Sequence, residues 1–123
     1  MLSRTSGASL RFEGKRKGAR QWFKGLKPGT EYELSFYVRM ENVTAAGPRG
    51  GLYARINDSG KAAHYLPKIP LTGTMNWTRH VYRFKTSPKS VTTANTIDFN
   101  FYRANGRAWI DHVGIYEVKG KSQ

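Results

Sequence analysis

The side chains best suited to chemistry in this sequence are tyrosine, arginine, aspartate and asparagine residues that alternate with apolar ones. An aromatic ring can stack on the apolar face of a sugar ring, while guanidinium, carboxylate and amide groups bind its hydroxyls in pairs. These side chains would form a binding surface if their strands were neighbours in one concave sheet; the alternative is that they decorate a solvated sheet face. The residues predicted to bind ligand are Tyr37, Arg39, Tyr53, Arg55, Asp98, Asn100 and Tyr102.

Catalytic chemistry finds little support in the sequence. A glycosidase needs two carboxylates roughly 5 to 9.5 Å apart, and Glu31 and Glu33 would lie about 7 Å apart along a strand. That spacing is common on exposed sheet faces. The sequence has no Gly-x-Ser-x-Gly motif, phosphate-binding loop or metal-spaced cluster. His64, His80 and His112 are scattered, which favours surface or packing roles. We therefore predict that the protein is not an enzyme.

The sequence is strongly basic, with 21 Lys and Arg residues against 8 Asp and Glu residues and a formal net charge of +13. A field of this size favours polyanionic partners such as an acidic polysaccharide, nucleic acid or an anionic surface. Residues 1–30 are the most basic part, and a Lys-Arg-Lys turn flanked by glycines lies within them; the alternative is a solvated turn. The residues predicted to contact a polyanion are Lys15, Arg16, Lys17 and Arg20.

A glycan partner is therefore expected to carry uronate or sulfate groups rather than to be neutral. Single-stranded nucleic acid is an alternative, because aromatic rings with cations also bind unpaired bases. It is less favoured, since the cationic residues are dispersed and no nucleic-acid-binding motif is present. The two classes differ in salt dependence, because binding to a polyphosphate collapses between low and moderate salt, whereas stacking on sugar persists.

The element expected to organise these side chains is a long strand that follows the turn at residues 27–30. Proline and glycine suit the corner positions of that turn. Apolar and polar residues then alternate through residue 41, which is the period of a strand with one buried face. The predicted buried face consists of Tyr32, Leu34, Phe36, Val38 and Met40.

Shorter strands are expected at 9–12, 20–23, 51–57, 77–85, 92–102 and 107–118. The first two are predicted to form a basic hairpin within residues 1–30, and Ala104-Asn105-Gly106 indicates another hairpin turn. Pro67 and Pro70 predict that residues 61–74 are irregular, with at most an edge pairing. No window has helical periodicity. The prediction is one all-β domain, residues 1–123, built as an antiparallel sandwich or barrel with a short tail at 119–123.

The order of three motifs resembles the jelly-roll carbohydrate-binding modules appended to bacterial glucanases and xylanases. The motifs are the Leu-Lys-Pro-Gly-Thr turn at 26–30, the strand from Trp-Thr at 77–78 to Phe-Lys-Thr at 84–86, and Trp-Ile-Asp-His-Val at 109–113. The resemblance covers roughly residues 6–118 and implies a jelly-roll β-sandwich. It also implies that Trp77 and Trp109 are core residues, and Trp22 is then the tryptophan expected to be most exposed.

Two departures from the family pattern carry further expectations. Family members usually begin with one more strand before the stretch that residues 6–10 resemble, and the present sequence is expected to lack that first strand. An unpaired sheet edge would result, which a neighbouring protein chain could complete by strand addition. The structural calcium of the family draws on the missing region and on an aspartate that Asp111 matches. Asp111 is therefore only a weak calcium candidate, and no cofactor is expected.

The function expected from these features is a non-catalytic module that binds a polysaccharide, acidic in character, on a concave sheet face. The first alternative is a structural protein of a phage virion, such as a capsid decoration protein, because the same fold is used there. The second is a basic nucleic-acid-binding domain. The sequence contains no cysteine and no apolar run of the roughly 18 residues that span a membrane. Residues 1–14 have no apolar stretch of the kind found in a signal peptide, so none is expected within this sequence. An extracellular or virion-surface location is favoured.

Overall fold

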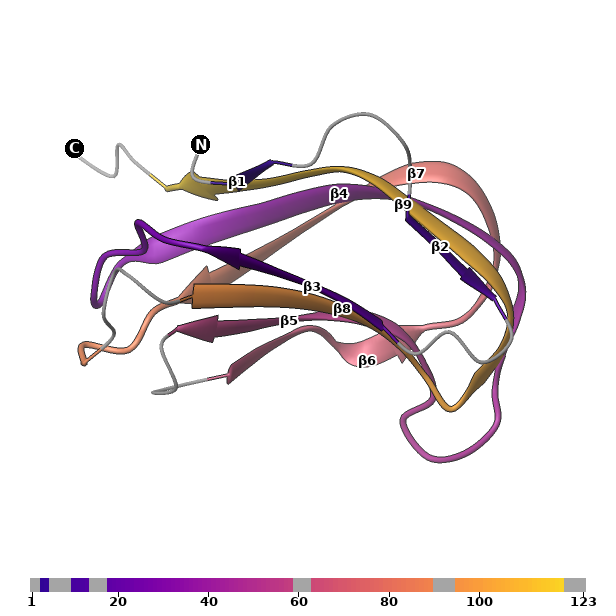
Figure 1. Cartoon of the computed structure of the whole chain (residues 1–123). Coiled ribbons are helices and arrows are strands. Elements are labelled where there is room, and N and C mark those ends of the chain that lie inside the picture. The colour runs from indigo at the N-terminus through magenta and orange to yellow at the C-terminus, as the bar shows by residue number, and fades with distance from the viewer. Residues whose placement is uncertain (1–2, 5–9, 14–17, 59–62, 90–94, 119–123) are drawn as a thin grey trace.

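The computed structural model describes residues 3–4, 10–13, 18–58, 63–89 and 95–118. Within these ranges the chain forms strands joined by turns (Figure 1). The strands are β1 Ser3–Arg4, β2 Leu10–Glu13, β3 Gly18–Phe23, β4 Glu31–Ala45, β5 Gly51–Asp58, β6 Ala63–Leu71, β7 Gly73–Lys85, β8 Asn95–Tyr102 and β9 Ala104–Glu117. The part of the chain that the structure describes contains no helix with the length and apolarity of a membrane span.

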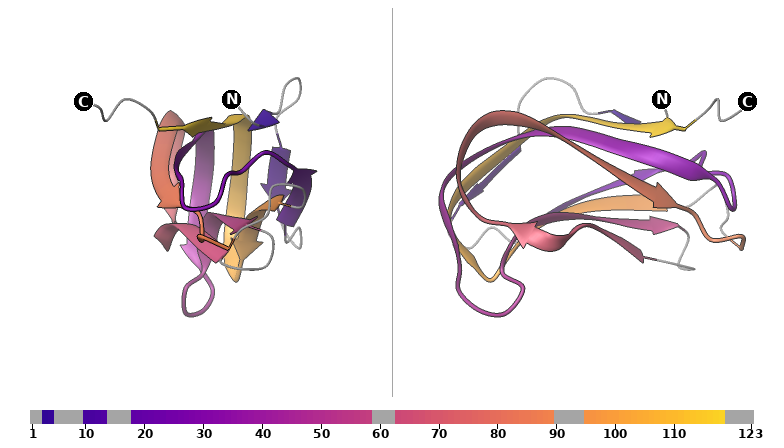
Figure 2. Two further views of the ribbon diagram at one scale, coloured as in Figure 1. Left: turned by 90° about the vertical axis from the view of Figure 1, so that its left-hand side faces the viewer. Right: turned by 180° about the vertical axis from the view of Figure 1, so that it is seen from behind.

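The strands form two antiparallel sheets that lie face to face (Figure 2). Sheet A has the order β1-β9-β4-β7, with β2 also paired to β9, and sheet B has the order β3-β8-β5-β6. This arrangement confirms the predicted all-β antiparallel sandwich. The outer edge of β9 is paired by β2 and by the two-residue β1. The edge that was expected to be open after loss of a first strand is therefore partly covered.

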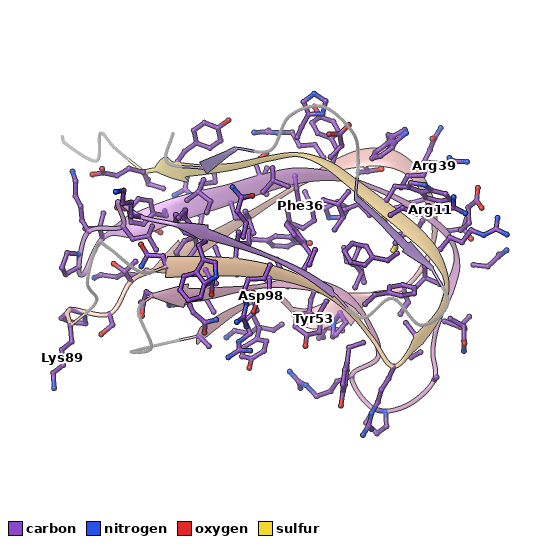
Figure 3. The ribbon with its side chains drawn as sticks, in the orientation of Figure 1. Arg11, Phe36, Arg39, Tyr53, Lys89 and Asp98 are labelled. Carbon is purple, nitrogen blue, oxygen red and sulfur yellow. The ribbon has the colours of Figure 1, made fainter. Side chains whose placement is uncertain are left out.

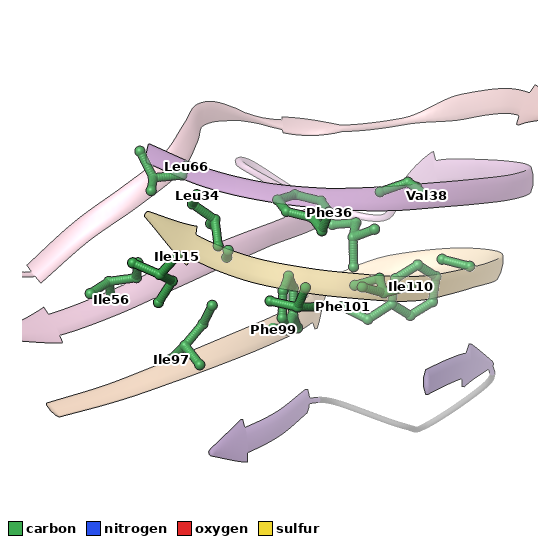
Figure 4. Packing of buried hydrophobic residues seen from close by; sticks show 14 of the residues in the cluster. Leu34, Phe36, Val38, Ile56, Leu66, Ile97, Phe99, Phe101, Ile110 and Ile115 are labelled. Atoms are coloured by element: carbon green, nitrogen blue, oxygen red, sulfur yellow. The ribbon is translucent and has the colours of Figure 1, made fainter. Parts of the chain in front are cut away.

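Apolar side chains from the inner faces of both sheets hold the sandwich together (Figure 4). The residues predicted on the buried face of β4 are all at most 1% exposed. Phe36 links the layers, because its ring lies 5.2 Å from that of Phe99 in sheet B and 5.9 Å from that of Tyr82 in sheet A. Each fully buried side chain of this size contributes about 1.5–3 kcal/mol. The cluster thereby fixes the two sheets against each other.

Both predicted hairpins are wrong, because the chain crosses between the sheets at these places. β2 belongs to sheet A and β3 to sheet B, so residues 1–30 do not form a hairpin. β8 and β9 also lie in different sheets, and the chain turns between them at Arg103, whose φ is 43°. Gly106, with a φ of 99°, lies inside β9 beside a register shift, where a Cβ would be 2.4 Å from the carbonyl oxygen of Asn42. Its positive φ serves a bulge rather than a turn.

The segment predicted to be irregular contains the edge strand β6 and the first residues of β7. Pro67 and Pro70 fit there, because an edge strand makes ladder hydrogen bonds on one side only. The pairing of β6 with β5 is bulged between Leu52 and Ala54, next to the prolines. The expected edge pairing is thus a nine-residue strand.

Two tryptophans that the resemblance placed in the core lie on the surface. Trp77 is 43% exposed. Trp109 is half-buried on the outer face of β9, where the guanidinium groups of Arg11 and Arg39 lie over its ring at 5.7 and 4.7 Å. The expectation for Trp109 is wrong because its neighbour Ile110 faces inward, and alternation then turns Trp109 outward. Trp22 is 65% exposed, the most of the three, as predicted.

Candidate functional site

Five of the seven residues predicted to bind ligand share the outer face of sheet B, hereafter the sheet B face. They are Tyr53, Arg55, Asp98, Asn100 and Tyr102. Tyr37 and Arg39 lie instead on the outer face of sheet A, on the other side of the sandwich. Figure 3 shows Arg39 and Tyr53 on these opposite sides. The prediction of one common surface is therefore wrong for these two residues. Alternation separates inward from outward side chains, but it does not say which sheet a strand joins.

A single row of side chains crosses all four strands of sheet B. Arg20 of β3 lies opposite Asp98 of β8, which lies opposite Arg55 of β5. Arg55 in turn lies opposite Tyr65 of β6. Because neighbouring strands are only about 4.8 Å apart, these four residues form a continuous band of cationic, anionic and aromatic groups across the face.

The charge of Asp98 is compensated within this row. Arg20 donates from Nε to Oδ1 of Asp98 at 2.6 Å and from Nη2 to Oδ2 at 3.1 Å, which is a bidentate pair. The hydrogen bond to Asp98, followed by its charge, raises the pKa of Arg20 above its ordinary value. Arg55 has no such partner: its Nε is buried and makes no hydrogen bond with any described residue. Its guanidinium lies 5.8 Å from the ring centroid of Tyr65.

Tyrosines surround a hollow of about 240 Å³ at the β6 side of the sheet B face, hereafter the tyrosine hollow. The rings of Tyr53 and Tyr65 lie there with their centroids 5.8 Å apart. Burial, and secondarily the neighbouring Tyr65, raise the pKa of Tyr53 above its ordinary value, so its phenol stays protonated at neutral pH and can donate a hydrogen bond. The other lining residues are Arg49, Pro67, Lys68, Pro70 and Tyr102.

A second hollow, of about 300 Å³, lies over β3, β8 and β5. Arg55 lines it, and its guanidinium lies over the ring of Tyr65, which lines the tyrosine hollow. Gly18 borders the second hollow, opposite Asn100 of β8. A Cβ at position 18 would be 2.8 Å from the carbonyl oxygen of Phe99 and 3.1 Å from Oδ1 of Asn100. Glycine at this position therefore leaves the amide of Asn100 room at the surface.

The sequence pattern does not predict Arg49, Tyr65 and Lys68 as site residues, although all three line the tyrosine hollow. Tyr65 and Lys68 lie in the segment whose prolines indicate irregular structure. Proline also favours an extended conformation in the residue before it. The residues restricted in this way are Leu66 and Ile69, so the segment is compatible with an extended edge strand that also carries Tyr65 and Lys68. This signal could have indicated both residues.

The remaining predicted contacts divide into those that the structure places and those that it does not. Lys15, Arg16 and Lys17 lie outside the described residues, whereas Arg20 lies on the sheet B face. Asp111 lies on the outer face of sheet A, where its Oδ1 accepts a hydrogen bond from the backbone N–H of His112 at 2.8 Å. Among the described residues no three His, Cys, Asp or Glu side chains are grouped to hold a metal ion, and calcium binding by Asp111 stays a prediction.

Comparison with known proteins finds similarity in structure rather than in sequence. No protein-family model matches the chain, and no curated protein is significantly similar to it in sequence. A structure of a family 4 carbohydrate-binding module (CBM4) is similar, with a TM-score of 0.57 and 14% sequence identity over 82% of this chain. The match covers 61% of the CBM4 chain, so the present chain spans less than two thirds of that protein's length. A family 16 carbohydrate-binding module has a TM-score of 0.53 and 21% identity, covering 89% of this chain and 76% of its own.

A third similar structure comes from a virus. The enzymatically active domain of tailspike protein 4 of bacteriophage CBA120 has a TM-score of 0.58 and 14% identity, covering 96% of this chain and 19% of its own. At such identities the likeness identifies the fold alone. The chain has the jelly-roll β-sandwich fold of carbohydrate-binding modules, as the order of its motifs predicts.

Proposed function

We propose that this protein is a non-catalytic carbohydrate-binding module whose sheet B face takes an acidic polysaccharide. The observation that carries the proposal is the four-residue row that runs from Arg20 to Tyr65 and borders the tyrosine hollow. The fold shared with two carbohydrate-binding modules supports this class of function. A location outside the cell, where polysaccharides are met, accords with the proposal.

Stacking would supply the part of the binding energy that does not depend on salt. The face of a sugar ring is apolar and its rim is polar, which matches tyrosine rings beside hydrogen-bonding groups. Tyr53 and Tyr65 are inclined to each other by 43° in the tyrosine hollow, and Tyr102 is 40% exposed at its edge. The protonated phenol of Tyr53 can donate to a ring or hydroxyl oxygen.

Charge would supply the selectivity for an acidic sugar. Of the described residues that line the two hollows, the cations are Arg20, Arg49, Arg55 and Lys68. The one carboxylate in this set, Asp98, is already bonded to Arg20. The face therefore presents an excess of positive charge beside its aromatic rings. A planar guanidinium can take a uronate carboxylate through two parallel hydrogen bonds, which favours Arg55 and Arg49 as the groups that bind it.

Affinity electrophoresis tests this proposal. The purified chain would be run through gels that contain polygalacturonate, alginate, xylan or a neutral glucan, each at two salt concentrations and with DNA as a competitor. We expect retardation by an acidic polysaccharide that decreases with salt but does not vanish, and that Tyr53→Ala removes. Tyr116→Ala is the matched control, because Tyr116 is also exposed but lies on β9 of sheet A.

Two results would reject the proposal. Equal retardation by every polyanion, abolished by moderate salt and competed away by DNA, would indicate non-specific or nucleic-acid binding. Retardation that Tyr53→Ala and Tyr116→Ala leave equally intact would show that the sheet B face does not bind the glycan.

A structural role in a virion is the second candidate, and one feature of the surface favours it. β6 and β7 are edge strands of sheets B and A, and a hollow of about 510 Å³ lies between them. Ile69 is 82% exposed there, next to Leu66 and Phe84. Two open edges beside an exposed apolar side chain suit a contact with a neighbouring subunit. Sedimentation equilibrium separates the candidates, because assembly requires oligomers that Ile69→Asp disrupts, whereas the binding module is a monomer.

A further inference from the structure

The outer face of sheet A carries a hollow of its own, on the side of the sandwich opposite the sheet B face. Its volume is about 370 Å³, and it is lined by Tyr37 of β4, Trp77 of β7, and Asp111 and His112 of β9. We call it the Trp77 hollow. Trp77 is 43% exposed and Tyr37 is 39% exposed, so neither ring is used to fill the core.

Two β-bulges bring these side chains together. Between the pairs Tyr37–Asp111 and Ser35–Gly114, β9 has one residue more than β4. His112 lies within that bulge with a φ of 52°, a conformation that costs a non-glycine residue about 1–3 kcal/mol. Its ring meets that of Tyr37 edge to face, with centroids 5.9 Å apart.

The second bulge is in β7. Between the pairs Val38–Thr78 and Met40–Met75, β7 has one residue more than β4, and Trp77 lies in this extra stretch. The side chain of Asn76 holds it, because its Oδ1 accepts a hydrogen bond from the backbone N–H of Trp77 at 2.9 Å. Bulges redirect side chains at binding sites. Here two of them, on either side of β4, border the same hollow.

The hydrogen-bonding groups of the Trp77 hollow differ from those of the sheet B face. Asp111 supplies the one carboxylate among the described lining residues. Its Oδ1 accepts from the backbone N–H of His112, and its Oδ2 lies 3.5 Å from Nδ1 of the His112 ring. An ionised carboxylate has about four acceptor sites, so others remain for a ligand. Among the described residues that line this hollow there is no Lys or Arg. The nearest arginine in register, Arg79, donates from Nε to Oγ of Ser35 at 3.1 Å.

We propose that the Trp77 hollow is a second carbohydrate site, which takes a neutral pyranose unit. A tryptophan and a tyrosine ring can cover the apolar face of the sugar, while the acceptor-only carboxylate of Asp111 binds hydroxyl donors and repels a uronate. The two faces then select ligands of different charge: an anionic sugar on the sheet B face and an uncharged one in the Trp77 hollow. This site does not depend on the function proposed for the sheet B face, and together they would let one chain link a neutral and an acidic polysaccharide.

Isothermal titration calorimetry tests the proposal with defined neutral probes: cellohexaose, xylohexaose, mannohexaose and laminarihexaose, each at low and high salt. We expect one of them to bind with an affinity that salt leaves nearly unchanged. Trp77→Ala should weaken that binding by about tenfold or more, and Asp111→Asn should weaken it less. Tyr53→Ala on the sheet B face and the control Tyr116→Ala should leave it unchanged.

The same variants distinguish failure of this site from failure of the sheet B site. Absence of binding by all four oligosaccharides at millimolar concentration would overturn the proposal for the Trp77 hollow. So would binding that Tyr53→Ala removes and Trp77→Ala does not, since the neutral sugar would then occupy the other face. Should Trp77→Ala not fold, as judged by circular dichroism, Asp111→Asn decides, because it retains the size of the side chain.

Discussion

Replacing Arg55 with methionine is expected to stabilise the fold while weakening the binding of an acidic polysaccharide. Arg55 lies in the middle of the sheet B face between Asp98, which is already paired with Arg20, and the ring of Tyr65. Its Nε is buried without a hydrogen-bond partner among the described residues. A site kept for a ligand would retain such a cation at the expense of stability.

The structure sets the size of both effects. A buried donor without a partner costs about 1–3 kcal/mol, and the contact of Arg55 with the ring of Tyr65 returns about 0.5–1 kcal/mol. Methionine fills similar space without a polar group, so Arg55→Met should stabilise the fold by about 0–2.5 kcal/mol. In a domain of this size each kcal/mol raises the melting temperature by roughly 3–6 °C. Loss of one charged hydrogen-bonding group should weaken polysaccharide binding by about ten- to a hundredfold.

Two measurements on the same samples check this prediction. Thermal unfolding without ligand gives the change in stability, and calorimetric titration with a defined oligogalacturonate at several salt concentrations gives the affinity. The slope of log K against log salt should fall by about 1 in Arg55→Met. Lys85→Met is the control, because Lys85 is an exposed cation on β7 of sheet A and its loss should leave specific binding unchanged.

The reasoning would be refuted by either of two outcomes. A loss of more than about 1 kcal/mol of stability in Arg55→Met would mean that the guanidinium is well satisfied in the folded chain. Unchanged affinity and salt slope would mean that Arg55 does not face the ligand.

Three further predictions concern the fold. Phe36→Ala should destabilise the chain by about 3–5 kcal/mol in urea unfolding, because the ring of Phe36 packs between the two sheets. Val81→Ala is the control and should cost little, since Val81 lies on the outer surface. Equal losses of stability in the two variants would contradict the assigned core. Gly106→Ala should cost about 2 kcal/mol or more, since its Cβ would clash with the backbone of Asn42; a variant as stable as the wild type would refute the bulge. Burial lowers the pKa of His80 below its ordinary 6.5, so the unfolded chain takes up a proton first as the pH falls. The contribution of His80 to the free energy of unfolding should therefore be fully present above pH 6.5 and should be lost as the pH falls toward the lowered pKa. Urea titrations from about pH 8 to about pH 5 should show a smaller decline in stability for His80→Phe. An unchanged pH profile in this variant would contradict the assignment to His80.

Local patterns predicted the strands and their buried faces well. The alternation in β4 is enough to predict a strand. Apolar residues at every second position all lie on one face of a strand, whereas in a helix they would not share a face. The same holds for β5 and β8, whose inward residues Ile56 and Phe99 are nearly inaccessible. The sequence pattern failed at turns: Gly106 needs a positive φ, but a bulge inside β9 satisfies that need as well as a hairpin would.

The candidate site could be predicted only in part. Tyr53, Arg55 and Asp98 are outward residues of strands that pair, so they share a face. Tyr37 has the same local pattern but lies on the opposite side, in a hollow with Trp77 that the sequence does not indicate. Tyr65 also belongs to the sheet B face, but it lies on the edge strand β6, and the prolines of that segment led to a prediction of irregular structure there.

Composition and alternation were enough to indicate that the chain is all-β and strongly basic, and which face of its long strand β4 is buried. They did not indicate that Trp77 and Trp109 lie outside the core. The tertiary structure alone decided which outward residues act together. Alternation and turn chemistry operate over a few neighbouring residues, whereas membership of a sheet depends on hydrogen bonds between strands far apart in the chain. Arg20 and Asp98, separated by 78 positions, meet only because β3 pairs with β8. Each face of the sandwich acquires its chemistry from such long-range pairings.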